Sequence, residues 1–489
     1  MATNSPTLLW FRQDLRLADN PALSAAVERG HPIIPVFIWA PEEEGLWRPG
    51  EASNWWLHRS LSALAKDLER RGSQLIIRHG PAAAVLHQLS VESDASFVFW
   101  NRRYEPQAIA RDSKLKAELR KSGIQAESFS GALLFEPWTI QNSSGQPFRV
   151  FTPFWKACLS KPCAQAAADA PASLPRPDTW PCTLTLDELK LTPSIDWASG
   201  LRDAWQPGES GAQQVLQRFQ TAALDEYQVG RDIPGVVGTS RLSPHLHFGE
   251  ISPGQIWRAL KQGKTSAASD AYLRQLGWRE FAHHVLYHFP NSAQQALRPE
   301  FAAFPWKTDA RSLHAWTQGK TGYPLVDAGM RELWHTGWMH NRVRMVAASF
   351  LVKHLLTGWQ EGAAWFWDTL VDANLANNTL GWQWVAGCGA DAAPYFRIFN
   401  PVIQGEKFDP NGSYVRQWVP ELAALPDEWL HKPWKAPASV LAKAGIELGA
   451  TYPAPIVDHD QARARALAAL SGMREKYNTP ARQPLASRT

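Results

Sequence analysis

The apolar runs TLLWF (residues 7–11) and PIIPVFIW (residues 32–39) decide the fold of the N-terminal part of this chain. Neither run alternates apolar with polar residues, which is typical of parallel strands buried on both faces of a sheet. Three further runs share this character: QLIIR (74–78), FVFW (97–100) and a last short run near Ala132–Phe135. We therefore expect five strands in one parallel sheet.

Amphipathic stretches of helical periodicity separate these apolar runs. The clearest spans Asn54–Arg71, with Ser53 or Asn54 as the expected N-cap and Gly72 as the residue that ends the helix. Alternating strands and helices predict a doubly wound α/β domain over residues 1–135. No GxGxxG follows the first strand, so the sequence lacks a dinucleotide-binding fingerprint.

Residues 136–210 have the character of a connector between two domains. Ten prolines fall between residues 131 and 210, and short helices are expected near Phe151–Leu159. Helical periodicity dominates residues 211–478, which predicts an all-α domain, and residues 479–489 are expected to form a short tail. The expected helices of this domain are Gly211–Gln228, Ser252–Gln262, Ser269–Tyr287, Pro324–Gly337, Asn341–Leu356, Glu361–Leu370 and Asp460–Lys476.

Composition leaves the role of the aromatic residues open. The chain of 489 residues has 25 Trp, 45% hydrophobic and 20% charged residues, and a net charge of +4 with a pI near 8.8. This balance is that of a soluble globular protein, and it permits nucleic-acid binding without requiring it. The many indoles either fill a large core, or they stack on bases and carry electrons.

The cysteines give no sign of a metal site. Cys158, Cys163, Cys182 and Cys388 form no CxxC pair, which favours free thiols over metal or iron–sulfur ligation. No apolar run reaches membrane-spanning length, and the first residues lack the pattern of a secretion signal. We expect a cytoplasmic monomer that binds no membrane.

One helical segment places polar and aromatic groups on a shared face. Gln275, Trp278 and Arg279 lie at positions i, i+3 and i+4, which combines an amide, an indole plane and a guanidinium. His284 and His288 are four residues apart and could ligate a metal. No HExxH motif or acid pair accompanies them, so packing or solvent-facing histidines are favoured over a metal site.

The segment DANLANNTLGWQW (372–384) joins an acid, several amides and two indoles. Arg344 shares a helix face with Asn341 and Met345, and it could form an ion pair with Asp372. A buried pair of this kind is costly to desolvate unless it has a function. Beside a flavin ring it would stabilise a reduced, anionic ring.

Two other segments carry weaker signals for anionic ligands. TSRLS (Thr239–Ser243) offers hydroxyl and backbone N–H groups to a phosphate, although its local sequence alone favours an ordinary helix-capping loop. Residues 393–418 interleave Arg397, Lys407 and Arg416 with aromatic rings, which is a pattern of nucleic-acid binding.

At this point the chain resembles the photolyase/cryptochrome family. The resemblance runs from LLWFRQDLRLADNPAL (8–23) to the stretches near Trp434. The most specific blocks occur in the same order as in the family: GTSRLSPHLHFGEISP (238–253), WREF (278–281), GWMHNRVRM (337–345) and NTLGWQWVAGCGADAAPYFRIFNP (378–401).

The resemblance implies an α/β domain joined by a long loop to a helical domain that binds FAD. The residues expected to hold FAD are Tyr227, Thr239, Ser240, Arg241, Leu242, Ser243, Tyr272, Arg344, Asp372, Ala373, Asn374 and Asn378. The residues expected to carry electrons to the flavin are Trp306, Trp359 and Trp382. Trp278 and Trp384 would grip a flipped-out pyrimidine dimer. The other residues expected at the DNA or the lesion are Arg231, Gln275, Arg279, Asn341, Arg342, Met345, Arg397 and Gln404.

The same resemblance implies a reaction, the light-dependent splitting of cyclobutane pyrimidine dimers in UV-damaged DNA, which is the activity of a deoxyribodipyrimidine photo-lyase. Asn341 and Met345 are the residues of cyclobutane dimer enzymes, whereas (6-4) photolyases and animal cryptochromes carry histidines there. Plant-type cryptochromes usually carry Asp where this chain has Asn378. The sequence NTLGWQWVAG is similar to the corresponding sequence of the bacterial class III branch. A photoreceptor without repair activity and a (6-4) photolyase stay as alternatives.

Three departures from the family pattern bear on these expectations. Gln275 replaces a glutamate usual in dimer photolyases and is found in (6-4) enzymes, which suggests slower repair or a shifted substrate. Asn374 replaces a common aspartate near the flavin. Gln107 and Ala108 stand where relatives that bind methenyltetrahydrofolate often carry Asn and Glu. A second, antenna chromophore would therefore be a folate held differently, a deazaflavin, or absent.

Overall fold

The computed structural model describes residues 5–162, 168–261 and 266–478 of the chain. These residues fall into two compact units, each described by itself here. The first unit holds the described residues up to Pro290, with Glu332–Met339 and Phe366–Asn378. The second holds Asn291–Arg331, His340–Trp365 and the described residues from Thr379 onward. Cys163 and the predicted tail at 479–489 lie outside the described residues.

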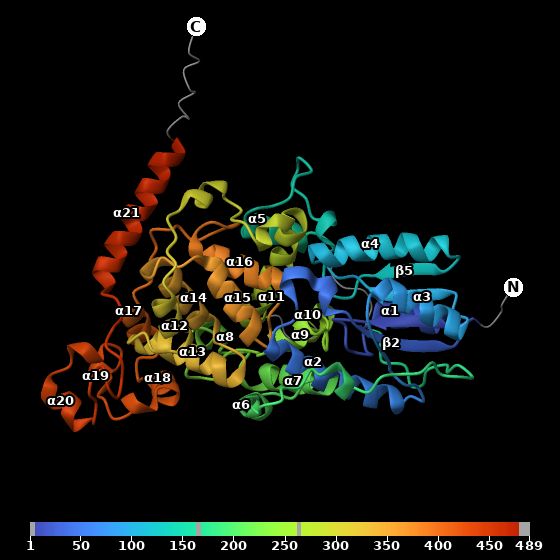
Figure 1. Cartoon of the computed structure of the whole chain (residues 1–489), viewed down its shortest axis with the longest axis horizontal. Coiled ribbons are helices and arrows are strands. Elements are labelled where there is room, and N and C mark those ends of the chain that lie inside the picture. Colours follow the sequence, from blue (N-terminus) through green and yellow to red (C-terminus); the bar gives the residue numbers. More distant parts are fainter. Residues whose placement is uncertain (1–4, 163–167, 262–265, 479–489) are drawn as a thin grey trace, which may run out of the picture. The chain divides into compact units, whose positions relative to one another are not determined.

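A five-stranded parallel sheet forms the N-terminal part of the first unit, as predicted (Figure 1). Its strands lie in the order β3-β2-β1-β4-β5, and neighbours pair in parallel throughout. The order reverses between β1 and β4, which makes the carboxyl ends of these two strands the topological switch point. The strand bounds are β1 Thr7–Phe11, β2 Ile33–Trp39, β3 Ile76–His79, β4 Phe97–Asn101 and β5 Gln125–Phe129.

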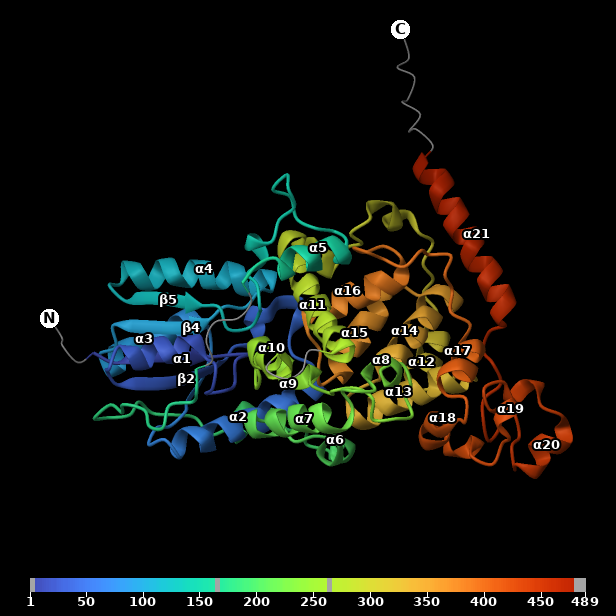
Figure 2. The same ribbon diagram turned by 180° about the vertical axis from the view of Figure 1, so that it is seen from behind.

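Both faces of the sheet are buried, which explains why its inner strands are apolar throughout. One face of β1 carries Leu9 and Phe11, which join a cluster with α1 (Pro21–Glu28) and α2 (Glu51–Glu69). The other face carries Leu8 and Trp10, which join a cluster with α3 (Ala82–Ser93) and α4 (Pro106–Lys121). Figure 2 shows this layered part in blue and cyan from behind. The predicted doubly wound fold is confirmed.

The prediction of the last strand was wrong. The fifth strand is Gln125–Phe129, not the run near Ala132–Phe135. β5 is an edge strand whose Gln125 and Glu127 are exposed, so it lacks the apolar signature of the inner strands. The Leu134 and Phe135 N–H groups, at 2.9 and 3.1 Å, both donate to the buried Glu280 carboxylate instead of to a neighbouring strand.

The start of α2 also differs from the prediction. The helix begins at Glu51 after Gly50, which caps it without a side-chain hydrogen bond, so neither Ser53 nor Asn54 is the N-cap. Ser53 is buried inside the helix, where its small side chain fits. Gly72 ends this region with φ +74°, as expected for a left-handed helix terminator.

Helices make up the regular structure of the described residues after the sheet, apart from isolated bridges. The expected helix over Gly211–Gln228 is two helices, because the chain turns at residues 223–226. The other predicted helices are confirmed to within a few residues. The remaining α-helices are α5 Phe151–Leu159, α6 Ser199–Ala204, α7 Glu209–Ala222, α8 Tyr227–Gly230, α9 Ser243–His247, α10 Pro253–Lys261, α11 Ala267–His288, α12 Ala310–Thr317, α13 Pro324–Thr336, α14 Asn341–Ser349, α15 Trp359–Thr369, α16 Leu375–Ala386, α17 Pro401–Phe408, α18 Ser413–Trp418, α19 Asp427–Leu430, α20 Ala438–Lys443 and α21 His459–Asn478.

Irregular helical turns complete the chain. A π-helical turn, η6 (Phe350–His354), continues α14 directly and accounts for the long predicted helix Asn341–Leu356. The 3₁₀ turns are η1 Pro41–Trp47, η2 Pro137–Thr139, η3 Asp187–Leu189, η4 Pro290–Ala293, η5 Pro299–Ala303, η7 Pro420–Leu422 and η8 Pro433–Lys435. No helix in the described ranges has the length and apolar character needed to cross a membrane. Cys158, Cys182 and Cys388 are free thiols, as expected.

Candidate functional site

The predicted site residues are divided between the two units. Those in the first unit are Tyr227, Arg231, Thr239, Ser240, Arg241, Leu242, Ser243, Tyr272, Gln275, Trp278, Arg279, Asp372, Ala373, Asn374 and Asn378. Those in the second unit are Trp306, Asn341, Arg342, Arg344, Met345, Trp359, Trp382, Trp384, Arg397 and Gln404.

The loop Thr239–Leu242 and the helix α11 form a polar cluster in the first unit. The Tyr272 hydroxyl donates to Ser240 Oγ at 2.8 Å, and the Tyr272 ring meets Tyr227 edge-on with centroids 5.2 Å apart. The Trp338 indole N–H donates to Ser243 Oγ at 3.3 Å. The structure therefore brings the predicted hydroxyl-bearing residues together although they are up to 45 positions apart in the sequence.

This cluster fits an anionic group such as the diphosphate of FAD. Arg241 stacks over the rings of Trp205 and Trp338, at 4.5 and 4.9 Å, and its buried Nε has no hydrogen-bond partner among the described residues. A guanidinium that lacks a partner for a buried N–H attracts an anion. Gly238 lies so close to the Gly230 backbone that a Cβ there would come within 2.3 Å of it. A side chain at Gly238 would therefore force the two backbone segments apart.

Asn374 has a defined side-chain orientation. Its Oδ1 accepts the Asn377 N–H at 3.1 Å at the start of α16, and its Nδ2 donates to His283 Nε2 at 3.4 Å. His283 Nδ1 lies 2.9 Å from the Arg279 carbonyl, which can only accept, so Nδ1 carries the proton and Nε2 is the acceptor. The Asn374 amide therefore has an N–H left to offer a ligand, where an aspartate would offer only an acceptor.

A small polar cavity of about 20 Å³ lies beside Asn374, within the first unit. Glu105, His247 and His283 line it, and a cavity of this size and polarity has room for a water molecule. Burial lowers the pKa of His247 to about 4 and lowers that of His283 as well, so both imidazoles are neutral at physiological pH. Although burial opposes it, the Arg103 charge holds the pKa of Glu105 below its usual range.

These buried histidines make stability depend on pH. The unfolded chain takes up a proton on each imidazole near pH 6.5, whereas folded His247 does so only near pH 4, so stability rises with pH across this interval. We expect urea denaturation to show a slope of up to about 1.4 kcal/mol per pH unit from His247 alone. The variant His247→Gln should flatten the slope, and an unchanged profile would contradict the assignment.

The three residues predicted to share a face of α11 differ in their surroundings. The Trp278 ring stacks on Phe151 with centroids 3.9 Å apart and planes 7° apart, so one of its faces is already covered. Gln275 is half-buried. Arg279 is 11% exposed and donates to the Ala132 carbonyl at 2.9 Å, so its placement gives no support to a contact with DNA phosphates. His284 is a packing residue, as expected, because its Nε2 accepts the Phe148 N–H.

The predicted electron-transfer tryptophans all lie in the second unit. Trp382 is 3% exposed. Its ring packs so closely on Gly362 that a Cβ at this glycine would come within 2.0 Å of it. Gly362 belongs to α15, the helix that begins at Trp359, which is 2% exposed. The Lys307 N–H donates to the carbonyl of Leu356 at 2.8 Å, and Leu356 lies three residues before Trp359. Trp306, which precedes Lys307, is half-exposed.

The residues expected to read the lesion lie on α14. Asn341 is exposed, and its Nδ2 lies 3.9 Å from Met345 Sδ, so the two side chains share one face as the spacing predicted. Arg342 is directed elsewhere, with its guanidinium 4.3 Å from the centre of the Phe408 ring. Arg344 is half-buried, and the ion pair expected between it and Asp372 stays a prediction.

A loop connects Trp384 to Gln404 in the second unit. The Trp384 carbonyl accepts the Ala393 N–H at 3.2 Å, and a turn then closes from Pro394 to Arg397, whose side chain is exposed. Asn400 caps α17 by accepting the N–H groups of Val402 and Ile403. The chain therefore keeps its three predicted DNA-facing residues on one short, hydrogen-bonded segment.

A second cavity, of about 90 Å³, lies at the carboxyl edge of β1, β2 and β4 in the first unit. This edge includes the topological switch point of the sheet, where doubly wound folds bind their ligands. Indoles line much of it, and the Nε1 atoms of Trp10 and Trp47 have no hydrogen-bond partner among the described residues. Gln107, singled out from the sequence, is one of the lining residues.

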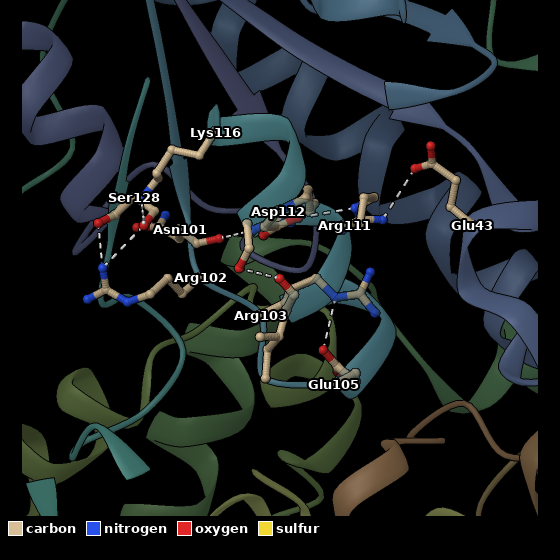
Figure 3. A network of polar contacts seen from close by, with 12 residues as sticks. Glu43, Asn101, Arg102, Arg103, Glu105, Arg111, Asp112, Lys116 and Ser128 are labelled. Atoms are coloured by element: carbon tan, nitrogen blue, oxygen red, sulfur yellow. Dashed lines mark hydrogen bonds and ion pairs between the residues drawn. The ribbon is translucent and has the colours of Figure 1, made fainter. Parts of the chain in front are cut away.

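Ion pairs hold the polar wall of this cavity in place. Figure 3 shows Arg103 directed at Glu105 and Arg111 directed at Glu43, around the start of α4. Arg103 also makes a bidentate pair with Glu44, at 2.7 and 2.9 Å, which ties the segment between β4 and α4 to η1. The wall is therefore rigid before any ligand binds.

Comparison with known proteins places the chain in a family. Residues 7–176 match the profile described as DNA photolyase, and residues 272–472 match the FAD binding domain of DNA photolyase. A deoxyribodipyrimidine photo-lyase from Agrobacterium fabrum is 51% identical, with 96% of this chain and 98% of that protein covered. The chain belongs to the photolyase/cryptochrome family, as its motifs indicated.

Two further relatives show where in the family the chain lies. The crystal structure of a bacterial class III photolyase from Agrobacterium tumefaciens matches with a TM-score of 0.94 at 51% identity, and covers 96% of this chain and 98% of that one. Cryptochrome-2 from Arabidopsis thaliana is 43% identical, with 97% of this chain and 80% of that protein covered. The resemblance to class III photolyases is confirmed, and cryptochromes are more distant.

Sequence reasoning missed the buried groups behind Asn374. Glu105, His247 and His283 lie far apart in the sequence, and each looks locally like an ordinary core or surface residue. Nothing in their spacing predicts that they line one cavity, because the cavity is formed by tertiary packing.

Proposed function

We propose that this chain is a light-dependent DNA repair flavoprotein that splits cyclobutane pyrimidine dimers, a deoxyribodipyrimidine photo-lyase. The observation that carries the proposal is the 51% identity to a photo-lyase over 96% of the chain, against 43% to a plant cryptochrome. The pair of Asn341, which is exposed, and Met345, which is half-buried, on α14 supports the choice of lesion, since these residue types go with cyclobutane dimers in the family.

The first unit offers the groups that would bind FAD. Tyr227, Tyr272 and the hydroxyls of the Thr239–Ser243 loop would hold its polar chain, and Arg241 would meet its phosphate charge. Asp372, Ala373, Asn374 and Asn378 would line the ring, and the resemblance to the family assigns the same role to Arg344. Bound FAD, when reduced and excited by light, supplies the single electron that opens the cyclobutane ring and recovers it afterwards.

The DNA would be held by charge and by stacking. Arg231, Arg342 and Arg397 would contact phosphates, which makes binding weaken as salt rises. A dimer stacks poorly in the duplex, so turning it out costs only a few kcal/mol. Trp278, whose far face is braced by Phe151, would grip the dimer together with Trp384. Gln404 on α17 would also contact the DNA.

The cavity at the switch point would hold a second chromophore. Its indole walls suit stacking on a flat ring. The unpartnered N–H groups of Trp10 and Trp47 favour a ring with acceptor atoms, which both a folate and a deazaflavin provide. The absorption spectrum of the purified protein distinguishes these two and an empty cavity.

Changing Gln275 tests the choice of substrate. Gln275 lies on α11 one turn before Trp278, and it can donate and accept hydrogen bonds but offers no carboxylic proton. We expect Gln275→Glu to raise the yield of cyclobutane dimer repair per absorbed photon, measured on a dimer-containing oligonucleotide. The variant Gln228→Glu, on α8, serves as a control for added charge. An unchanged yield would remove the argument that Gln275 slows repair.

A repair assay tests the proposal as a whole. Reduced protein is mixed in blue light with an oligonucleotide that carries a cyclobutane thymine dimer, and separately with one that carries a (6-4) product, with dark controls. Loss of the cyclobutane dimer in the light only is the expected result. Repair of the (6-4) product alone would mean that Gln275, and not Asn341 and Met345, indicates the lesion that the protein repairs. Failure on both lesions, with flavin that still photoreduces, would indicate a photoreceptor.

The remaining expectations belong to the same proposal. We propose a cytoplasmic monomer with an N-terminal α/β domain at 1–135 that could hold an antenna chromophore, a connector at 136–210 and an FAD- and DNA-binding domain at 211–478. Size-exclusion chromatography with light scattering measures the oligomeric state.

A further inference from the structure

Lys353 is a buried cation that the proposed reaction does not use. It lies in the π-helical turn η6 and is 1% exposed. A lysine is rarely buried to this extent, because desolvation of its ammonium group is costly. π-helical turns are also uncommon, and they occur frequently at functional sites.

The Lys353 ammonium group holds the loop that carries Arg397. Nζ donates to the Arg397 carbonyl at 2.7 Å and lies 5.3 Å from the centre of the Tyr395 ring. Nearby, the Phe399 N–H donates to Ser349 Oγ at 3.4 Å, just before the π-helical turn. The loop is therefore fastened from below, while Phe396, 60% exposed, and the Arg397 side chain face outward.

The charge on Lys353 is finely balanced. Burial, and after it repulsion by the Arg397 guanidinium, lowers the pKa of Lys353 to about 7. The titratable neighbours are Arg397, Tyr395 and His354. His354 is kept neutral because burial lowers its pKa to about 3, and it hydrogen-bonds His459 at 2.8 Å. Burial keeps Tyr395 protonated by raising its pKa.

We propose that Lys353 is a positioning residue for DNA, which holds the Pro394–Asn400 loop through the Arg397 carbonyl and takes up a proton when that loop binds a phosphate. The inference rests on the proposed function, in which Arg397 contacts DNA. A phosphate on Arg397 offsets the repulsion that disfavours the Lys353 ammonium group. The proton is therefore held more tightly in the complex than in the free protein.

The sign of the linkage follows from this shift. A group whose pKa is higher in the complex binds protons on association, so affinity is greatest where Lys353 is already protonated, below about pH 7. Affinity should fall as the pH rises above that value. A shift of one pKa unit corresponds to an affinity about tenfold weaker at pH 9 than at pH 6.

The test measures binding of a dimer-containing duplex in the dark, by fluorescence anisotropy at constant salt from pH 6 to pH 9. The wild-type protein should show the decline of about tenfold. Lys353→Arg keeps a donor and stays charged, so it should bind like the wild type at pH 6 and lose the pH dependence. Lys353→Met should bind about fivefold more weakly at pH 6, as expected for one lost hydrogen bond, and should also lose the pH dependence. The exposed Lys320→Met is the matched control and should behave as the wild type.

Calorimetry of the unmodified protein provides a test that needs no variant to fold. Titration of the duplex in buffers of different ionisation enthalpy should reveal net proton uptake at pH 7 to 8. No uptake, or a Lys353→Met variant with the wild-type pH profile, would overturn the inference. A protein that repairs dimers but fails these tests contradicts the role of Lys353 alone, whereas a protein that neither binds nor repairs dimers contradicts the proposed function.

Discussion

Trp382→Phe is expected to slow photoreduction of the bound flavin by about tenfold or more, because phenylalanine is far harder to oxidise than an indole. Trp382 is buried, as Trp359 is, and its ring packs on α15 at Gly362. Blue light in the presence of an external thiol reductant, followed by absorption at the flavin band, measures the rate. Trp359→Phe should have a similar effect.

Trp316→Phe is the matched control for this prediction. Trp316 is also fully buried, and its ring meets that of Trp382 edge-on with centroids 6.2 Å apart. Its indole N–H donates to the Ala347 carbonyl. The substitution therefore removes a buried indole near Trp382 but keeps the three tryptophans proposed to transfer electrons. Photoreduction that persists in Trp359→Phe but stops in Trp316→Phe would show that electrons reach the flavin through Trp316 and not through Trp359.

Glu250→Ala is expected to lower the free energy of unfolding by about 3–5 kcal/mol, the cost of breaking a buried charged network. The Glu250 carboxylate is fully buried and accepts hydrogen bonds from the Trp56 indole at 3.0 Å and the Gly208 backbone at 2.7 Å. His245 Nδ1 lies against its other oxygen. Alanine would leave all three groups buried without this acceptor, and each would lose its hydrogen bond.

Urea denaturation followed by tryptophan fluorescence measures this loss. Glu118→Ala is the control in the same unit, because Glu118 is exposed and makes only a 3.8 Å pair with Lys114 within one helix. That substitution should change stability by less than about 0.5 kcal/mol. A Glu250→Ala variant as stable as the control would mean that water replaces the carboxylate in the network.

Local patterns in the sequence were enough for much of the fold. The apolar runs predicted four of the five strands, because inner strands of a parallel sheet are buried on both faces. They failed for Gln125–Phe129, since an edge strand exposes polar residues and loses that signature. The start of α2 was misplaced for a related reason, because a glycine N-cap gives no side-chain signal.

Part of the candidate site could also be predicted from local sequence patterns, and part could not. Spacing on one helix predicted that Asn341 and Met345 share a face, since side chains four positions apart meet on any α-helix. Motifs characteristic of the family indicated the FAD-binding domain, and the comparisons confirmed it. Spacing could not predict that Arg279 is turned inward to the Ala132 carbonyl, because a position on a helix face does not say what covers it.

By itself, the sequence determined the parallel sheet, the helical second half and the family, all of which depend on periodicity or on ordered motifs. Only the tertiary structure decided which way the Asn374 amide turns, where the aromatic cavity lies, and that the Lys353 ammonium group holds the Arg397 carbonyl. Each of these depends on groups that are distant in the sequence and meet by packing. Burial then sets their charge, since an ammonium group or an imidazole that loses water titrates at a lower pH.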